Sequence, residues 1–90
     1  MQSAEITVVN KLGLHARPSA KLTQVATRFT AEVWITRKGR RINAKSIMGV
    51  MMLAAAKGAT LLVETDGPDE IEALAEIRAL IESGFGEELE

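Results

Sequence analysis

The hydrophobic pattern of this 90-residue chain changes repeatedly between the period of two that suits a strand and the period of about 3.6 that suits a helix. Alternating or helically spaced apolar residues predict strands over 4–9, 31–36, 41–44 and 59–65, and helices over 16–28, 46–53 and between Pro68 and Gly84. A chain of this length has room for one hydrophobic core, which all these segments should share. We therefore predict a single domain over 1–90, a two-layer α+β sandwich in the order β-α-β-β-α-β-α with the helices on one face of a sheet.

The second helix carries more apolar side chains than one buried face can hold. Ser46 is its expected N-cap. Val50, Leu53 and Ala54 form its expected buried stripe. The side chains left nearer the surface are Ile47, Met48 and either Met51 or Met52. Surface methionines adapt to partners of different shape, but methionines also fill irregular core edges, and the pattern leaves both interpretations open.

The third helix is expected to end at a glycine. Gly84 follows the last apolar position of the helical pattern, and glycine is the usual residue just beyond a helix C-terminus. Phe85 comes next, and a hydrophobic residue at this point commonly packs back onto the final turn. We therefore expect Phe85 to fold back against the helix.

Charge is divided between the two halves of the chain. Residues 11–45 hold nine Lys or Arg and one acid, whereas residues 64–90 hold ten Asp or Glu and one base. Such a division favours either a basic face that recruits an acidic partner or anionic ligand, or a solvated basic hairpin opposite an acidic helix. Charge alone does not separate these two interpretations.

Composition argues against several classes of protein. The chain has no cysteine, which excludes a disulfide scaffold and cysteine-based zinc or redox sites. No apolar stretch approaches the roughly 20 residues of a membrane span, and the N-terminus lacks the pattern of a signal peptide. We therefore expect a cytoplasmic protein without membrane insertion. With one histidine and no carboxylate between Glu5 and Glu32, we expect no metal site, and we expect no cofactor.

The only histidine, His15, stands where the first helix is predicted to begin. The free N–H groups of a first turn carry partial positive charge, and Arg17 adds a forked cation, so together they suit phosphate oxygens. Imidazole offers a neutral nucleophilic nitrogen near neutral pH, and Gly13 permits a backbone that keeps the ring open. The alternative is that His15 only caps the helix and Arg17 is an ordinary surface cation. The helix start, the arginine and the glycine together favour a histidine that carries a phosphoryl group. No second base is evident to orient His15, so we expect a site that holds a group and does not turn over a substrate.

Three segments together resemble the HPr family, the histidine-containing phosphocarrier proteins of the bacterial phosphoenolpyruvate-dependent phosphotransferase system. They are Gly13–Pro18, Lys45–Met51 and Ala56–Gly58, and the similarity extends over essentially the whole chain. The resemblance implies an open-faced β-sandwich, in which three helices cover one side of a four-stranded antiparallel sheet.

The resemblance also implies a role for individual residues. His15 would accept a phosphoryl group from enzyme I on Nδ1 and pass it to an enzyme IIA domain. Arg17 matches the arginine that neutralises the phosphoryl oxygens. Ser46 matches a serine that HPr kinase/phosphorylase modifies in many relatives, although the residues alone favour its role as an N-cap. The partner-binding positions that the resemblance implies are apolar: Ala16, Ala20, Ile47, Met48 and Met51.

Two parts of the chain resemble different branches of the family. Residues 83–88 resemble the nitrogen-related branch, NPr, whereas residues 46–51 resemble regulated HPr proteins, so an acceptor in sugar uptake and one in nitrogen regulation both stay open. Gln24, Thr27 and Gly49 stand where some enteric sugar carriers have lysines. We expect a monomer that is transiently phosphorylated and is not an enzyme acting on a small substrate.

Two other classes are alternatives to a phosphocarrier. The basic segment 11–45 suggests a small nucleic-acid-binding module, and an idle histidine would leave a purely regulatory protein-binding module. The aromatic residues, Phe29, Trp34 and Phe85, make up only 3% of the chain and are too scattered for base stacking. We therefore expect no nucleic-acid partner and rank both alternatives below the phosphocarrier.

Overall fold

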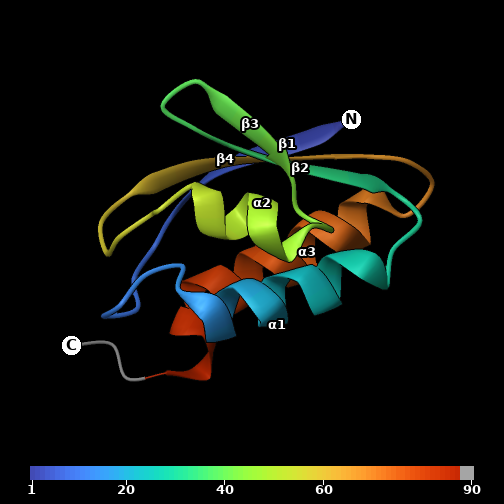
Figure 1. The fold of residues 1–90 in the computed structure, drawn as a ribbon. Helices are drawn as coiled ribbons and strands as arrows, with labels where there is room; N and C mark the ends of the chain where they lie inside the picture. Colours follow the sequence, from blue (N-terminus) through green and yellow to red (C-terminus); the bar gives the residue numbers. More distant parts are fainter. Residues whose placement is uncertain (88–90) are drawn as a thin grey trace.

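The computed structural model describes residues 1–87 and confirms the predicted order of elements (Figure 1). In chain order they are β1 (Gln2–Thr7), α1 (Ala16–Thr27), β2 (Glu32–Arg37), β3 (Arg40–Asn43), α2 (Ile47–Met52), β4 (Thr60–Asp66), α3 (Glu70–Glu82) and the short 3₁₀ helix η1 (Gly84–Gly86). Within this part of the chain, no helix combines the length and the apolarity needed to cross a bilayer.

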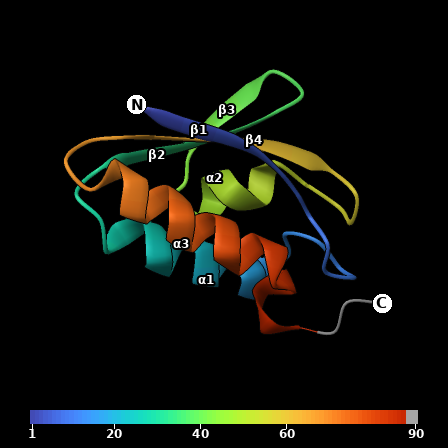
Figure 2. The ribbon, with the colours of Figure 1, turned by 180° about the vertical axis from the view of Figure 1, so that it is seen from behind.

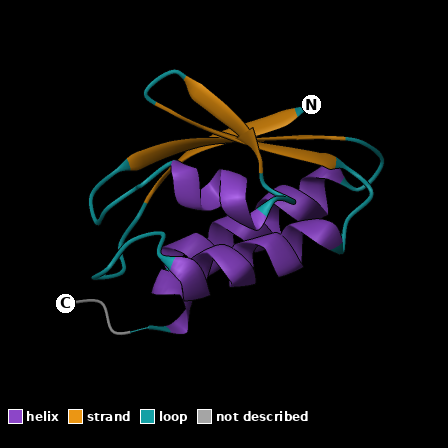
Figure 3. Ribbon diagram, in the orientation of Figure 1, coloured by secondary structure: helices purple, strands orange, loops and turns teal. Residues whose placement is uncertain are grey.

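The strands form one antiparallel sheet in the order β1-β4-β2-β3. Ile6 of β1 pairs with Leu61 of β4, and Ile35 of β2 pairs with Val63 of β4, so alternate side chains gather on one face. These four side chains are at most 1% exposed. The helices α1, α2 and α3 all lie against that face and leave the other open, as the opposite views in Figures 1 and 2 and the colouring in Figure 3 show. The predicted open-faced α+β sandwich is confirmed.

Each helix contributes a buried stripe to the core. Leu22 and Ala26 of α1, Val50 of α2, and Ile77 and Ile81 of α3 are fully buried. One predicted core residue was wrong. Ala54 is exposed, because α2 ends at Met52 and the chain turns at once into a left-handed residue, φ 51°, at position 54. The helical spacing that predicted its burial does not extend that far.

The chain reverses direction after α3, as the glycine there predicts. Gly84, Phe85 and Gly86 have φ values of 71°, 59° and 74°. The Phe85 side chain is 1% exposed and packs in the core, which confirms that it folds back. In both Figure 1 and Figure 2, this red end of the chain lies beside the blue start of α1.

The basic and acidic halves of the sequence meet through pairs that cross between elements. Arg28 Nη2 lies 2.9 Å from Glu76 Oε1 and joins α1 to α3. Arg41 Nε lies 3.5 Å from Glu64 Oε1, and its guanidinium also lies 4.5 Å from the centre of the Trp34 ring. Exposed pairs of this kind contribute only about 0–1 kcal/mol each. These pairs neutralise the charges of Arg28 and Arg41 with acidic residues from the second half of the chain.

Candidate functional site

His15 is the N-cap residue of α1. Its backbone is extended, φ −81° and ψ −168°, and its carbonyl oxygen accepts from the N–H of Ser19 at 3.0 Å. The ring itself makes no capping hydrogen bond, and 38% of the side chain is exposed. The imidazole therefore does not cap the helix, and it lies partly exposed at the positive end of the helix.

The loop before α1 fixes the backbone at His15. Gly13 has a φ of 69°, and a Cβ atom there would overlap the backbone oxygen of Ala55. The next N–H, that of Leu14, donates to this same oxygen at 2.8 Å. The His15 N–H donates to the Gly13 oxygen at 3.0 Å. Gly13 is therefore needed both for its left-handed backbone and for the close approach of the loop to the segment that follows α2.

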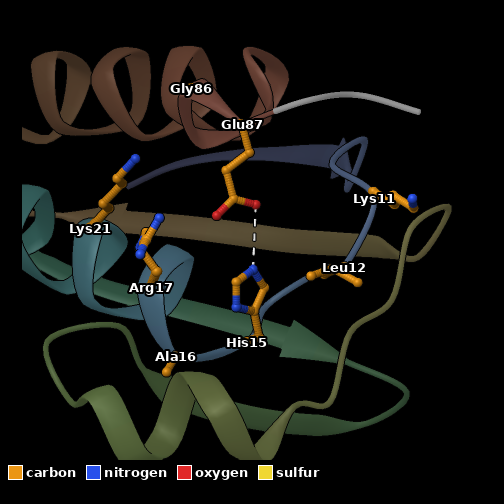
Figure 4. A pocket seen from close by; sticks show the side chains of 8 residues that line it. All are labelled: Lys11, Leu12, His15, Ala16, Arg17, Lys21, Gly86 and Glu87. Carbon is orange, nitrogen blue, oxygen red and sulfur yellow. Dashed lines mark hydrogen bonds and ion pairs between the residues drawn. The ribbon is translucent and has the colours of Figure 1, made fainter.

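A cleft opens around the His15 ring between α1, the preceding loop and the C-terminal turn (Figure 4). Three cations line it, Lys11, Arg17 and Lys21. Lys21 Nζ donates to the Phe85 backbone oxygen at 2.6 Å. The Arg17 side chain is exposed and makes no hydrogen bond or ion pair with any other residue of the described chain, 1–87. Its guanidinium is therefore available to an anion that binds in the cleft.

Sequence analysis missed the cleft residues Lys11 and Lys21 and the carboxylate beside the ring, Glu87. Its Oε1 atom lies 3.4 Å from Nε2 of His15 and accepts from Nδ2 of Asn10 at 3.2 Å. Burial by itself raises the pKa of Glu87, but hydrogen bonds from Asn10 and His15, with the charges of His15 and Lys21, outweigh it and lower the pKa below its ordinary value of 4.5. The structure therefore places a carboxylate beside the ring, although no second base is evident there in the sequence. The only sequence clue to Glu87 is its place just after the Gly-Phe-Gly turn.

The two ring nitrogens of His15 have different surroundings. Nε2 faces Glu87. No hydrogen bond within residues 1–87 engages Nδ1, which in Figure 4 lies on the edge of the ring toward the start of α1. Nδ1 is thus the ring nitrogen without a hydrogen-bond partner among residues 1–87, and it lies on the side of the ring toward the start of α1.

Ser46 and α2 lie along α1, apart from the His15 ring. Ser46 is exposed and caps α2 with its hydroxyl, which accepts from the Gly49 N–H at 3.1 Å, as predicted. The segment before Ser46 contacts the far half of α1, because Thr23 Oγ1 donates to the Ala44 oxygen at 3.2 Å. The structure thus places Ser46 beside the later turns of α1 and does not bring it to His15.

The predicted partner-binding side chains come from two packed helices, α1 and α2. On α2, Ile47, Met48 and Met51 are 44%, 70% and 39% exposed, so these residues are not buried in a core edge. On α1, Ala16 is exposed and Ala20 is half-buried. We call these five residues the apolar patch. It adjoins the cleft, since Ala16 follows His15 directly and also lines the cleft.

The chain matches known proteins over nearly all of its length. A family model described as PTS HPr component phosphorylation site matches residues 2–83. The phosphocarrier protein HPr of Cupriavidus necator is 59% identical, with 97% of this chain and 98% of that protein covered. The crystal structure of HPr-C-His from Thermoanaerobacter tengcongensis superposes with a TM-score of 0.95 at 44% identity, with 99% of this chain and 100% of that chain covered. The crystal structure of an HPr dimer from the same organism has a TM-score of 0.78 at 42% identity, covering 97% and 100% of the two chains.

Proposed function

The chain belongs to the HPr family and is a phosphocarrier of the phosphotransferase system, and from this premise we propose that His15 accepts a phosphoryl group from enzyme I and donates it to an enzyme IIA domain. The observation that carries the proposal is a partly exposed imidazole at the start of α1, whose Nδ1 has no hydrogen-bond partner among residues 1–87, with the guanidinium of Arg17, likewise unpaired within those residues, on the same cleft. Both an attacking atom and anion-binding groups are present there.

The proposed transfer is an in-line displacement at phosphorus. The Nδ1 lone pair of His15 attacks phosphorus in line, while the bond from phosphorus to the donor nitrogen of enzyme I breaks and its electron pair stays on that donor. In this proposal the amides of the first turn of α1 and the Arg17 guanidinium stabilise the negative charge on the phosphoryl oxygens. The same steps in reverse order pass the group on to enzyme IIA.

Partner docking is assigned to the apolar patch. Its exposed α2 side chains, Ile47, Met48 and Met51, are flexible or branched apolar groups that adapt to different partner surfaces. A small apolar surface with cations at its edge suits transient complexes that form and dissociate quickly. We place Ser46 at the edge of this patch as a site of regulatory phosphorylation, where about two negative charges would hinder docking.

We further propose that the carrier works as a cytoplasmic monomer. A carrier has to present one surface to two partners in turn, and a dimer that covered the patch would prevent this. Analytical ultracentrifugation of the free protein is expected to give the monomer mass. A stable dimer that dissociates only when Met48 is changed to a charged residue would contradict this part of the proposal.

A reconstituted relay tests the whole proposal. The protein is incubated with phosphoenolpyruvate and enzyme I, then with separate enzyme IIA proteins of sugar uptake and of nitrogen regulation, and the phosphoryl group is followed on each. We expect wild type to support transfer to at least one acceptor, which also identifies the branch. Transfer that proceeds equally well without the carrier would contradict the proposal.

A further inference from the structure

The C-terminal turn is built to bring one carboxylate to the His15 ring. Its residues 84–86 all have left-handed backbone, and Phe85 holds this conformation without being glycine, φ 59°. Such a residue needs support from its surroundings. The Phe85 side chain is 1% exposed in the core, and its carbonyl oxygen accepts from Lys21 Nζ at 2.6 Å. The turn is therefore fixed at a side chain and at the backbone, and Glu87 extends from it toward His15 (Figure 4).

A buried amide fixes the carboxylate as well. Asn10 is fully buried, and its Nδ2 donates to the Gly13 oxygen at 2.9 Å and to Glu87 Oε1 at 3.2 Å. The Gly13 oxygen also accepts from the His15 N–H, and Glu87 Oε1 faces His15 Nε2 at 3.4 Å. One side chain thus holds both the backbone that carries His15 and the carboxylate that meets its ring.

The charges around Glu87 favour its ionised form. Lys21 and Arg17 of α1 and Lys11 of the preceding loop line the same cleft, and His15 faces the carboxylate directly. Despite the opposing effect of burial, the hydrogen bonds from Asn10 and His15 keep the pKa of Glu87 low. At neutral pH the carboxylate only accepts hydrogen bonds, so the ring nitrogen that faces it is the one that carries the proton.

We propose that Glu87 is a positioning residue for phosphoryl transfer, which keeps Nε2 of His15 protonated and leaves the lone pair of Nδ1 free for phosphorus. This inference rests on the function proposed above. The N–P bond forms at Nδ1, the donor keeps the electrons of the bond that breaks, and no proton leaves His15. The phosphorylated ring is then a cation with its proton on Nε2, and Glu87 lies against that cation.

Two variants and one control test the proposal. Glu87→Ala removes the acceptor, and Glu87→Gln keeps an acceptor oxygen but removes the charge. Glu72→Ala is the control, because the Glu72 side chain is exposed and makes no hydrogen bond or ion pair among residues 1–87. In the unphosphorylated protein, nitrogen-edited NMR measures exchange of the Nε2 proton with water. We expect this exchange to be about three- to tenfold faster in Glu87→Ala and unchanged in the control.

The phosphorylated proteins provide the second measurement. A phosphorus NMR titration follows the proton on Nε2 of phospho-His15. We expect both Glu87 variants to lower the proton affinity of that nitrogen about three- to tenfold, with the Glu72 variant equal to wild type. A residue that only supports the fold would not change this titration selectively.

The outcomes separate the two proposals. Unchanged proton exchange in Glu87→Ala, or an unchanged titration in Glu87→Gln, would overturn the role of Glu87 while phosphorylation of His15 stands. Failure of wild type to become phosphorylated would instead contradict the proposed function, and the exchange measurement on the unphosphorylated protein would still decide whether Glu87 holds the Nε2 proton.

Discussion

Nζ of Lys21 lies 2.6 Å from the backbone oxygen of Phe85, and this contact joins α1 to the turn that carries Glu87. The two residues are 64 positions apart in the chain. A lysine on the helix that begins at His15 thus holds in place the segment that supplies the carboxylate opposite the His15 ring. The C-terminal turn belongs to the site for this reason, although it lies far from the histidine in the sequence.

Lys21→Met is expected to loosen this turn. The variant keeps the apolar stem of the side chain but loses the hydrogen bond, which is worth about 0.5–1.5 kcal/mol. Hydrogen exchange at the Glu87 N–H, which donates to the Gly84 oxygen at 3.0 Å, should become faster. Lys11→Met is the matched control, because Lys11 lines the same cleft without a hydrogen bond or ion pair in the described chain. Equal exchange in the two variants would remove Lys21 from this role.

Arg17→Ala is expected to slow phosphoryl transfer to His15 about tenfold, which corresponds to about 1.4 kcal/mol of lost transition-state stabilisation. Because Arg17 is exposed and unpaired within residues 1–87, circular dichroism and the unfolding temperature should stay those of wild type. Rapid-quench kinetics with phosphorylated enzyme I measures the rate. Arg28→Ala, at the other end of α1, should transfer normally, and an Arg17 variant that behaves like it would rule out the assigned role.

The Ser46 position allows charge to be separated from helix capping. Ser46→Asp and Ser46→Asn both keep an oxygen that can accept from the Gly49 N–H, so α2 should stay capped in both. Only Ser46→Asp adds a negative charge beside the apolar patch. We expect calorimetric titration to show weaker binding of enzyme I to Ser46→Asp and normal binding to Ser46→Asn. Equal affinities of the two variants would count against a charge switch at this position.

Gly13→Ala is expected to destabilise the protein by about 1–3 kcal/mol through its left-handed backbone, with an added cost from overlap with the Ala55 oxygen. Gly39→Ala separates the two effects, since Gly39 also has a positive φ, 80°, but a Cβ atom there meets nothing within 4 Å. Urea unfolding should therefore show a larger loss for Gly13→Ala than for Gly39→Ala. Similar losses would mean that the loop can move away from α2 without difficulty.

Stability should fall in acid partly because of Asp69, which joins the start of α3 to the start of β2. Its carboxylate accepts from the Thr30 N–H at 2.9 Å and the Ala31 N–H at 2.8 Å. The bond from Thr30, supported by that from Ala31 and opposed by burial, lowers the pKa of Asp69 below 3.8. The stabilisation of the fold by the ionised Asp69 carboxylate is therefore complete above pH 3.8, the ordinary pKa of this group. It is lost as the pH falls through the lower pKa that Asp69 has in the folded protein. Urea unfolding at several pH values should show a shallower acid dependence for Asp69→Asn, and Glu72→Gln should match wild type.

The sequence predicts the elements of this fold well because their apolar residues follow regular periods. The alternation in β1 and β4 and the helical spacing in α1 and α3 are local patterns that the common core imposes. The place of His15 follows from the same patterns, since the first helix has to begin near it. Ala54 was misjudged because a period does not say at which residue a helix stops.

The carboxylate of the site could not be predicted in this way. Glu87 meets His15 across 72 positions, and the contact depends on a turn of three left-handed residues and on a buried Asn10. Asn10 looks like an ordinary loop residue in the sequence. Its burial, and with it the link between the loop and the C-terminal turn, is set only when the whole chain packs.

The most direct test of the phosphocarrier mechanism is intact mass spectrometry after incubation with phosphoenolpyruvate and enzyme I, run at neutral pH and again after brief acid treatment. Wild type should gain the mass of one phosphoryl group and lose it in acid, and His15→Ala should gain none. An equal gain of mass by His15→Ala would contradict the mechanism, because the phosphoryl group would then reside on another residue.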